Sequence, residues 1–339
     1  MNLTTRYLGL ELRNPLVASP SPLSWTVDGV RRLADGGVGA VVLYSLFEEQ
    51  LRQAAARDEA LVAAGADRFG EALGYFPALV SGPDADPGPR RYLSLVTRAV
   101  AAVDVPIIAS LNGVTPGGWI RYARAMQDAG AAAIELNIFY LPGDPHISGR
   151  EVEQRHLEVM VAVKESVTVP VAVKLSPYFS STGEMALRLD RAGADGLVLF
   201  NRFLQPDIDP ETLRVVAAVR LSNPAEARLP RTWIALLRGR VTASLAATSG
   251  VESADDLISY LLAGADVVMT TSALLRHGPG HAQVLLDDLS DWMRRKGFDT
   301  VDEVRGLLAA PPGIDHTATE RGDYVSAMRQ ANTKSYGPW

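Results

Sequence analysis

Lys174 stands near the end of the apolar run Val169-Pro-Val-Ala-Val-Lys-Leu-Ser-Pro, where a charged side chain is unusual. Only four of the 33 basic residues are lysines, so each lysine position is informative. An ammonium ion at the end of a buried strand needs a counter-charge or a ligand. Three interpretations are open: Lys174 stabilises negative charge on a flavin ring, forms a Schiff base with a carbonyl substrate, or belongs to a structural salt bridge.

Two asparagines also close apolar runs. Asn137 follows Ala133-Ile-Glu-Leu, and Asn201 follows Leu197-Val-Leu-Phe. Asparagine is a poor strand former, so its presence at two equivalent strand ends suggests amides that hold a planar heterocycle through a donor and an acceptor. Either residue alone could instead cap the following turn. Together with Lys174, the two favour a functional site.

Two later segments have the composition of phosphate-binding loops. Ala246-Ala-Thr-Ser-Gly-Val and Met269-Thr-Thr-Ser-Ala each lead from an apolar run through small hydroxyl residues or glycine towards a helix. Backbone amides at such a helix start face an anion and are favoured by the helix dipole. We therefore predict that Ser249, Gly250, Thr271 and Ser272 hold a phosphate group. The alternative is ordinary N-capping by serine or threonine.

Composition excludes several kinds of chemistry. The chain has no cysteine, and therefore no thiolate nucleophile, disulfide, cysteine-bound zinc or iron-sulphur cluster of its own. The five histidines show no metal-ligand spacing, so no metal site is expected, and His156 is expected to be solvated on the polar face of a helix. The net charge of −6 argues against a nucleic-acid partner.

The chain carries neither the apolar segment of a signal peptide nor an apolar run long enough to cross a membrane. The sequence therefore predicts a cytoplasmic protein without a membrane anchor.

The elements that must position these residues alternate along the chain. Short runs of valine, isoleucine and alanine are separated by amphipathic stretches, as in parallel strands that helices cover on both faces. The expected strands are residues 15–19, 40–44, 106–111, 133–138, 169–175, 196–200, 244–248 and 266–270. Eight such units in one chain predict an α/β fold, a (β/α)8 TIM barrel with insertions at the C-terminal face of the strands.

No linker or charge block divides the chain. We therefore predict a single barrel domain over residues 1–312 and a polar C-terminal tail over residues 313–339. Two stretches, 48–91 and 204–240, exceed a minimal barrel. Long insertions after strands usually build the rim of an active site.

The order of these features resembles the dihydroorotate dehydrogenase family, in its soluble class 1 form. Its opening strand is similar to Asn14-Pro-Leu-Val-Ala-Ser19, and its fourth-strand asparagine motif is similar to Glu135-Leu-Asn137. Its flavin-lysine strand is similar to Pro170-Val-Ala-Val-Lys174-Leu-Ser-Pro-Tyr-Phe179. Thr248-Ser-Gly-Val251 and Thr270-Thr-Ser-Ala-Leu274 resemble its two phosphate loops. The resemblance extends from about Leu10 to Phe298.

The resemblance implies an FMN-binding barrel in which hydride passes between a substrate carbon and flavin N5 while a loop residue transfers a proton. It places Lys174 beside the flavin ring, with Asn137 and Asn201 binding flavin or substrate. Ala18 and Ser19 would line the ring pocket, and the four loop residues named above would hold the phosphate. It further implies pyrimidine metabolism, a homodimer, and a separate electron-transfer protein as a partner.

The chain departs from this family at three positions. The family's cysteine or serine base is replaced by Tyr140, and a phenol is a poor base at neutral pH but a competent acid. Tyr44 stands where the family has a lysine for the substrate carboxylate, and Glu71 where it has an asparagine. Losing a cation and gaining an acid would repel an anion such as orotate. The substrate is therefore expected to be dihydropyrimidine-like without necessarily being dihydroorotate.

Two other functions are compatible with the same residues. The first is a class I aldolase-type barrel in which Lys174 forms a Schiff base, although the sequence shows no acidic partner for it at the neighbouring strand ends. The second is a protein that binds FMN without turnover.

Overall fold

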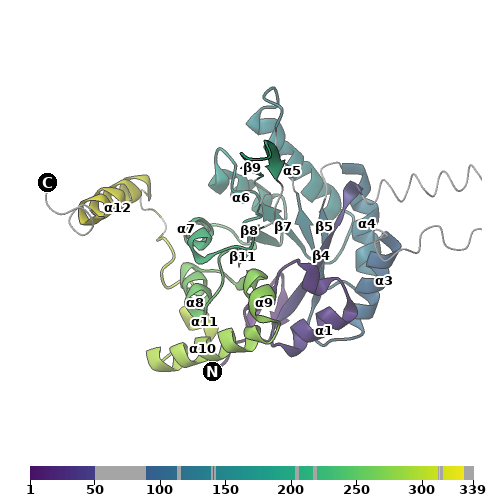
Figure 1. Ribbon diagram of the computed structural model, residues 1–339, viewed down its shortest axis with the longest axis horizontal. Coiled ribbons are helices and arrows are strands. Elements are labelled where there is room, and N and C mark those ends of the chain that lie inside the picture. Colours follow the sequence, from purple (N-terminus) through teal and green to yellow (C-terminus); the bar gives the residue numbers. More distant parts are fainter. Residues whose placement is uncertain are drawn as a thin grey trace, which may run out of the picture.

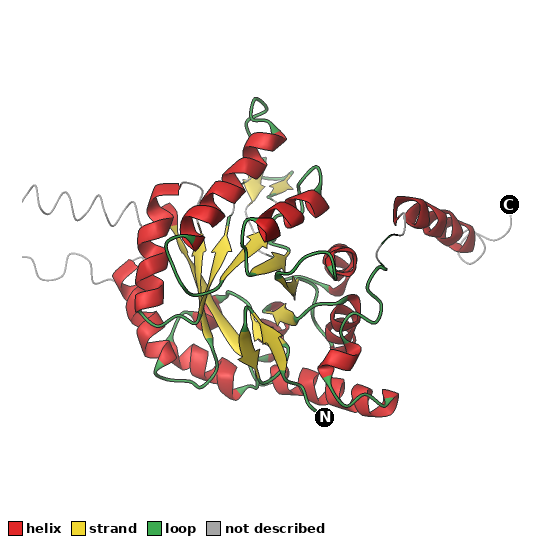
Figure 2. Cartoon of the chain, turned by 180° about the vertical axis from the view of Figure 1, so that it is seen from behind, coloured by secondary structure: helices red, strands yellow, loops and turns green. Residues whose placement is uncertain are grey.

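Eight parallel strands close into a barrel that is surrounded by helices (Figures 1 and 2). The computed structural model describes residues 1–49, 89–112, 116–138, 140, 143–202, 206–216, 220–311, 313 and 316–331. The (β/α)8 TIM barrel predicted from the sequence is confirmed.

All the predicted barrel strands are present, with small differences at their ends. They are β3 (Leu16–Ala18), β4 (Ala40–Phe47), β5 (Ile107–Asn112), β6 (Ala133–Asn137), β7 (Val171–Leu175), β8 (Gly196–Leu199), β11 (Ser244–Thr248) and β12 (Val267–Thr270). Each pairs with its neighbour in chain order, and β12 pairs with β3 to close the barrel. Their carboxyl ends therefore all lie at one end of the barrel, where enzymes of this fold place their active sites.

Helices follow most of the strands and pack on the outside of the barrel. They are α1 (Val27–Asp35), α3 (Pro89–Val100), α4 (Pro116–Asp128), α5 (Gly149–Lys164), α6 (Thr182–Arg191), α7 (Arg228–Leu237), α8 (Ala254–Ala263), α9 (Ser272–His277), α10 (His281–Lys296) and α11 (Val301–Val304). Among the described residues, no helix is both long and apolar enough to span a membrane.

The barrel has two apolar layers because alternate strand residues face opposite sides. The outer layer packs against the helices, and the inner layer contains small side chains such as Val17, Val42 and Ala172. An N-terminal hairpin of β1 (Thr5–Tyr7) and β2 (Leu10–Leu12), which was not expected from the sequence, adds Tyr7 and Leu12 to the inner layer.

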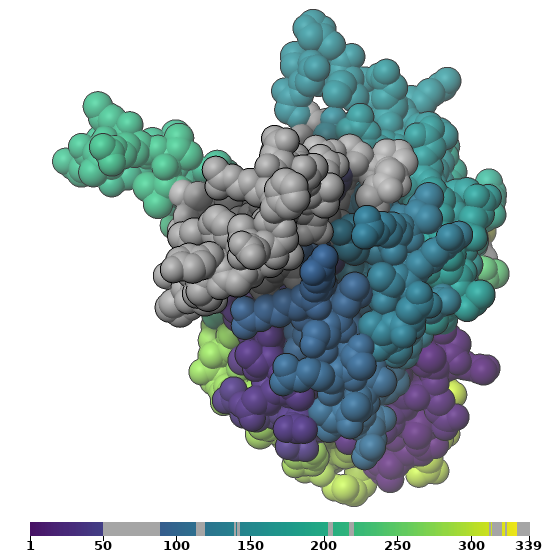
Figure 3. Space-filling view, turned by 90° about the vertical axis from the view of Figure 1, so that its right-hand side faces the viewer, coloured from purple at the N-terminus to yellow at the C-terminus, as the bar shows by residue number. Residues whose placement is uncertain are grey.

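The insertion after β8 forms its own small elements. A hairpin of β9 (Asp207–Asp209) and β10 (Arg214–Val216) projects from the body of the molecule (Figure 3). It is followed by η3 (Pro224–Ala227) and then by α7. A short helix, η1 (Pro22–Ser24), follows β3. The helix η1 packs against β4, and η3 lies against Gly250 in the loop after β11.

The predicted C-terminal tail contains a helix, α12 (His316–Ala331). It lies apart from the barrel in Figure 1 and exposes Tyr324, Val325 and Met328. The domain boundary at residues 312 and 313 remains a prediction.

The expectation that His156 is solvated is wrong. Its side chain is only 1% exposed, because α5 turns it towards Phe179, with which it makes an edge-on ring contact at 5.1 Å. One ring nitrogen, Nδ1, lies 2.8 Å from the Val152 carbonyl oxygen, and the other has no hydrogen-bond partner. Burial lowers the pKa of His156 below its ordinary value.

We expect His156 to make stability depend on pH. Above pH ~6.5 the ring is neutral in both the folded and the unfolded chain, and the native stability is complete. Below that pH the unfolded chain takes up a proton that the buried ring resists. The free energy of unfolding should therefore fall with decreasing pH by up to about 1.4 kcal/mol per pH unit, until the lowered pKa is passed. When the free energy of unfolding is measured by chemical unfolding between pH 8 and pH 5, it should depend less steeply on pH in His156→Gln than in the wild type. The exposed residue His146 provides the control, because His146→Gln should keep the pH dependence of the wild type. Equal slopes of the free energy of unfolding against pH in all three proteins would contradict the role of His156.

Candidate active site

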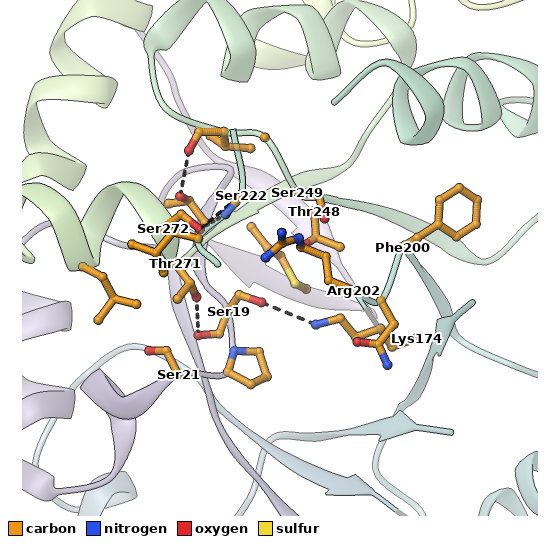
Figure 4. Close-up of a pocket in the computed structure, with 18 of the residues that line it drawn as sticks. Ser19, Ser21, Lys174, Phe200, Arg202, Ser222, Thr248, Ser249, Thr271 and Ser272 are labelled. Atoms are coloured by element: carbon orange, nitrogen blue, oxygen red, sulfur yellow. Dashed lines mark hydrogen bonds between the residues drawn. The ribbon is translucent and has the colours of Figure 1, made fainter. Parts of the chain in front are cut away.

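A cavity opens at the carboxyl ends of β3, β7, β8, β11 and β12 (Figure 4). Residues from all five strand ends line it, and they include most of the cofactor contacts predicted from the sequence. The predicted residues on its wall are Ser19, Lys174, Asn201, Ser249, Gly250, Thr271 and Ser272. The barrel thus brings together residues that are far apart in the chain.

Lys174 is a buried cation in this cavity. Its residue is 7% exposed, and its Nζ lies 3.5 Å from Ser19 Oγ and 3.5 Å from Glu135 Oε1. The sequence-based view that no acid lies beside Lys174 is wrong. Glu135 lies on the adjacent strand β6, where strand register rather than sequence proximity brings it next to the lysine. The ammonium group therefore lies between a carboxylate inside the barrel and the open cavity.

Amide side chains stand at the same level as Lys174. Backbone register places Asn112 of β5 beside Asn137 of β6, and Asn137 beside Lys174. Asn201, just after β8, donates a hydrogen bond from Nδ2 to Asn137 Oδ1. Asn112 is 4% exposed, and its Nδ2 finds no hydrogen-bond partner among the described residues. Sequence reasoning missed Asn112, although it closes a strand in the same way as Asn137.

A register shift in β4 changes which residue faces the barrel interior. Val42 pairs with Ile108, whereas Ser45 pairs with Ser110, so β4 contains one extra residue between these pairs. Such a bulge reverses the alternation of side chains that follow it. Ser45 consequently faces inward, 2.8 Å from the Ser110 hydroxyl and 3.5 Å from the Asn137 amide nitrogen.

Tyr44, predicted to contact the substrate, therefore packs in the outer layer. Its ring makes edge contacts with Trp25 and Tyr92, with centroid distances of 6.1 and 5.0 Å. It is not among the residues that line the cavity. Tyr92 is buried and bonds through its hydroxyl to the backbone of Ser110, which fixes this aromatic cluster against β5.

The two predicted residues at the end of β3 face different layers. Ala18 belongs to the outer core, so its methyl group is directed away from the cavity. Ser19 lies on the cavity wall, and its backbone N–H donates to the Thr270 carbonyl at 3.1 Å. Ser19 is therefore the member of this pair whose side chain can meet a ligand.

The loop after β11 holds an unusual backbone conformation. Ser249 and Gly250 have φ values of 80° and 70°, so two consecutive residues are left-handed. This conformation is costly for serine, and such strain is found preferentially at functional sites. Neither residue caps a helix, because α8 begins later and has Ser253 as its N-cap. The capping alternative therefore does not explain this loop.

The loop after β12 also leaves helix amides available. Thr271 is the N-cap residue of α9, but its side chain makes no capping bond and instead donates to the Ser19 carbonyl at 3.0 Å. The Ser272 hydroxyl lies 2.9 Å from the hydroxyl of Ser222, a residue of the insertion that sequence reasoning missed (Figure 4). The first amides of α9 thus face the cavity side without an internal side-chain cap.

Two arginines of the same insertion also line the cavity wall. Arg202 follows Asn201 directly, and Arg220 comes later in the insertion. The Arg202 guanidinium is held by Glu226 at 2.7 Å and by the carbonyl oxygen of Arg220 at 2.6 Å. Neither arginine was predicted. Arg220 is itself paired with Asp207 at 2.6 Å. Both guanidinium groups are therefore matched by carboxylates, as Lys174 is by Glu135, and they offer N–H donors rather than uncompensated positive charge.

Asn137 and Tyr140 are predicted residues that do not line this cavity, although Asn137 is bonded to Asn201 on its wall. Tyr140 is half-buried after β6, with the Arg155 guanidinium of α5 4.5 Å above its ring centroid. Glu71 lies outside the described residues. The described part of the chain contains no cluster of side chains suited to a metal ion.

The donor set of the cavity fits FMN. A flavin ring needs amide donors and acceptors at its edge and a cation near the side that gains negative charge; Asn201 and Lys174 on the cavity wall offer these, with Asn137 bonded to Asn201 behind the wall. Asn112, level with Asn137 on β5, keeps a buried amide without a partner among the described residues, but it does not line the cavity. The strained loop after β11 and the start of α9 offer backbone amides to a phosphate.

Comparison with known proteins agrees with this geometry. The family model for dihydroorotate dehydrogenase matches residues 86–293. The dihydroorotate dehydrogenase B (NAD(+)) catalytic subunit of Methanothermobacter thermautotrophicus is 29% identical over 313 residues, covering 90% of this chain and 98% of that protein. The catalytic subunit of the same name from Geobacillus sp. is 32% identical over 233 residues, covering 65% of this chain and 72% of that protein. The region that the family model matches contains the Lys174 strand and both candidate phosphate loops. The chain therefore belongs to the dihydroorotate dehydrogenase family.

Proposed function

We propose that this protein is an FMN-dependent oxidoreductase acting on the CH–CH or C=C bond of a dihydropyrimidine-like substrate. The observation that carries the proposal is the buried Lys174 ammonium at the cavity, level with Asn112 and Asn137 and close to Ser19. When bound, FMN supplies hydride transfer at N5. Neither the family match nor the relatives compared above point to an aldolase, so the Schiff-base alternative has no support.

The residues around the cavity divide the binding between the two ends of FMN. Ser249, Gly250, Thr271 and Ser272 would hold the phosphate through backbone amides and hydroxyls. Asn137 and Asn201 would bind the edge of the ring or the substrate, and their mutual hydrogen bond fixes which amide atoms remain available. Lys174 would favour negative charge on the ring.

Proton transfer to the substrate is proposed for Tyr140. It stands at the position of the family's base, and a phenol is a poor base at neutral pH but a competent acid. Donation suits reduction of an activated double bond. The proposed direction is therefore from C=C to CH–CH.

The substrate is proposed to be dihydropyrimidine-like, and not necessarily dihydroorotate. Tyr44 provides no cation and lies in the outer layer, which removes the family's lysine contact. Arg202 and Arg220, however, line the cavity, and although each is paired with a carboxylate, their guanidinium groups offer hydrogen-bond donors to an acidic group. A substrate bearing an acidic group is therefore included in the proposal.

FMN binding provides the first test. The purified full chain, supplied with FMN and passed through a desalting column, should retain visible flavin absorbance. Anaerobic photoreduction followed by a panel of pyrimidines and enones should then identify a compound that reoxidises the flavin rapidly. A chain that retains no FMN would contradict the proposal, and a chain that retains FMN but is reoxidised by no compound would favour the inactive FMN-binding alternative.

Tyr140→Phe should reduce turnover with the best compound of this panel by at least ~100-fold, the contribution typical of a general acid. FMN retention should be unchanged, because the hydroxyl is assigned only to proton transfer. Tyr122→Phe is the matched control, since Arg121 lies 5.7 Å above its ring on α4. Stopped-flow reoxidation measures the effect. Equal rates for Tyr140→Phe and wild type would exclude Tyr140 as the acid.

We also propose a homodimer and a separate electron-transfer protein. Support for the second comes from the relatives' names, which describe catalytic subunits of an NAD(+)-linked enzyme. Mass measurement in solution tests the homodimer. Because the proposed direction consumes reduced FMN, anaerobic reduction of the bound FMN by NADH tests the second proposal: slow reduction by NADH alone supports a separate electron-transfer protein, and rapid direct reduction contradicts it.

A further inference from the structure

Glu135 is a buried carboxylate to which the proposed chemistry assigns no role. It lies on β6 facing the barrel interior and is 1% exposed. Its register partners are Ser110 on β5 and Ala172 on β7. Among the described residues, neither of its carboxylate oxygens has a hydrogen-bond partner. A charged group in such surroundings is stable only when an opposite charge lies nearby.

Lys174 provides that charge. Its Nζ lies 3.5 Å from Glu135 Oε1, and both side chains are more than nine-tenths buried. Among the described residues no other cation forms an ion pair with Glu135. The Ser110 hydroxyl is directed to Ser45 instead, 2.8 Å away. The carboxylate therefore depends on Lys174 alone.

A second titratable side chain in the barrel interior, Tyr7, is affected by the negative charge of Glu135. Tyr7 is fully buried, and its hydroxyl has no hydrogen-bond partner. Burial raises the pKa of Tyr7, and the negative charges of Glu135 and then Asp266 raise it further. Asp266 is itself paired with Arg238 and Arg305, so Glu135 is the carboxylate whose charge is compensated only from the cavity side.

The two charges of the Glu135–Lys174 ion pair lie at different depths along the barrel. Asn137 is the register partner of Lys174, and Glu135 lies two residues earlier on the same strand, one inward-facing position deeper. The ammonium group thus has the Glu135 carboxylate on its interior side. On its cavity side it contacts Ser19 (Figure 4). A ligand in the cavity experiences the lysine's positive charge reduced by the carboxylate behind it.

We propose that Glu135 is a positioning residue that draws the Lys174 ammonium towards the barrel interior and reduces the positive field it exerts on a flavin in the cavity. Glu135 thereby lowers the reduction potential of the bound FMN. This inference rests on the proposed function, because it requires FMN beside Lys174.

The test compares FMN reduction potentials of the full-length holoprotein by anaerobic titration against reference dyes. Glu135→Gln keeps the shape of the side chain and removes its charge. It should shift the equilibrium towards reduced FMN at least tenfold, which for a two-electron couple is about 30 mV. Glu153→Gln is the matched control, since Glu153 pairs with Arg188 at 2.8 Å in the outer layer, and it should leave the potential unchanged.

The route through Lys174 is tested by a double-mutant cycle. In a Lys174→Met background, Glu135→Gln should change the equilibrium less than threefold. An equal shift in both backgrounds would show that Glu135 does not act through the lysine. If Glu135→Gln does not fold, Glu135→Asp retains the charge but moves it away from Lys174 by one methylene group. The potential should then rise measurably, by less than the tenfold shift, and an unchanged potential would contradict the role of Glu135.

The outcomes separate this inference from the proposed function. Wild-type protein that binds no FMN contradicts both. Wild-type protein that binds FMN, together with Glu135 variants whose potentials equal that of the wild type, overturns only the role of Glu135.

Discussion

Replacing Lys174 with methionine should lower turnover of the FMN-loaded protein by ~100-fold or more, as expected when a preorganised group that stabilises developing charge is removed. The same substitution should reduce the free energy of unfolding by about 3–5 kcal/mol, because it leaves one partner of a buried ion pair uncompensated. The remaining partner is Glu135, whose oxygens accept no hydrogen bond. Chemical unfolding and stopped-flow reoxidation measure the two effects.

A double variant separates stability from catalysis. Lys174→Met with Glu135→Gln removes both charges, so it should recover most of the lost stability and none of the lost turnover. Lys164→Met is the control, because Lys164 is paired with Asp195 at a site where both side chains are about one-third exposed. An exposed pair of this kind contributes less than about 1 kcal/mol. If Lys164→Met and Lys174→Met destabilise the protein equally, Lys174 has no special electrostatic role.

The barrel could be predicted because its signal is repeated and local. Parallel strands covered on both faces appear as continuous apolar runs, and all the predicted runs form barrel strands. The hairpin of β1 and β2 was missed because its strands are three residues each and carry no such run. Its contribution, a tyrosine and two leucines in the barrel interior, depends on long-range packing that local patterns do not contain.

The site could be predicted only in part, for two physical reasons. First, chain position does not reveal cross-strand neighbours, so Glu135 was not recognised as the partner of Lys174. Second, β4 contains one extra residue, so the side chains after it point to the opposite side from the one that strict alternation predicts. Tyr44 therefore points outward and Ser45 points inward. Lys174 and Asn201, which line the cavity, could be singled out because their side-chain types are anomalous at strand ends, a property that is visible in the sequence alone.

Gly250→Ala should be the most damaging single change in the candidate phosphate loops. The φ value of Gly250 is +70°, and an added Cβ would lie 2.6 Å from the Ala227 backbone nitrogen and 2.9 Å from the Asn223 carbonyl oxygen. Left-handed strain of about 1–2 kcal/mol and overpacking of about 1–3 kcal/mol should together destabilise the protein by roughly 2–5 kcal/mol. Because the contacts are with backbone atoms, the loop must move to relieve them. FMN affinity should therefore fall at least tenfold.

Gly297→Ala measures the effect of backbone strain without the steric contacts that Gly250→Ala introduces. Gly297 has a φ of +78° and no neighbour within 4 Å of an added Cβ, so this variant carries the backbone strain alone. It should cost about 1–2 kcal/mol and leave FMN affinity at the wild-type value, because it lies after α10 and away from the cavity wall. Riboflavin, which lacks the phosphate, adds a second comparison. If Gly250→Ala displaces the phosphate cradle, FMN should lose its advantage over riboflavin in that variant alone. A preserved FMN preference would place the phosphate elsewhere in the barrel mouth.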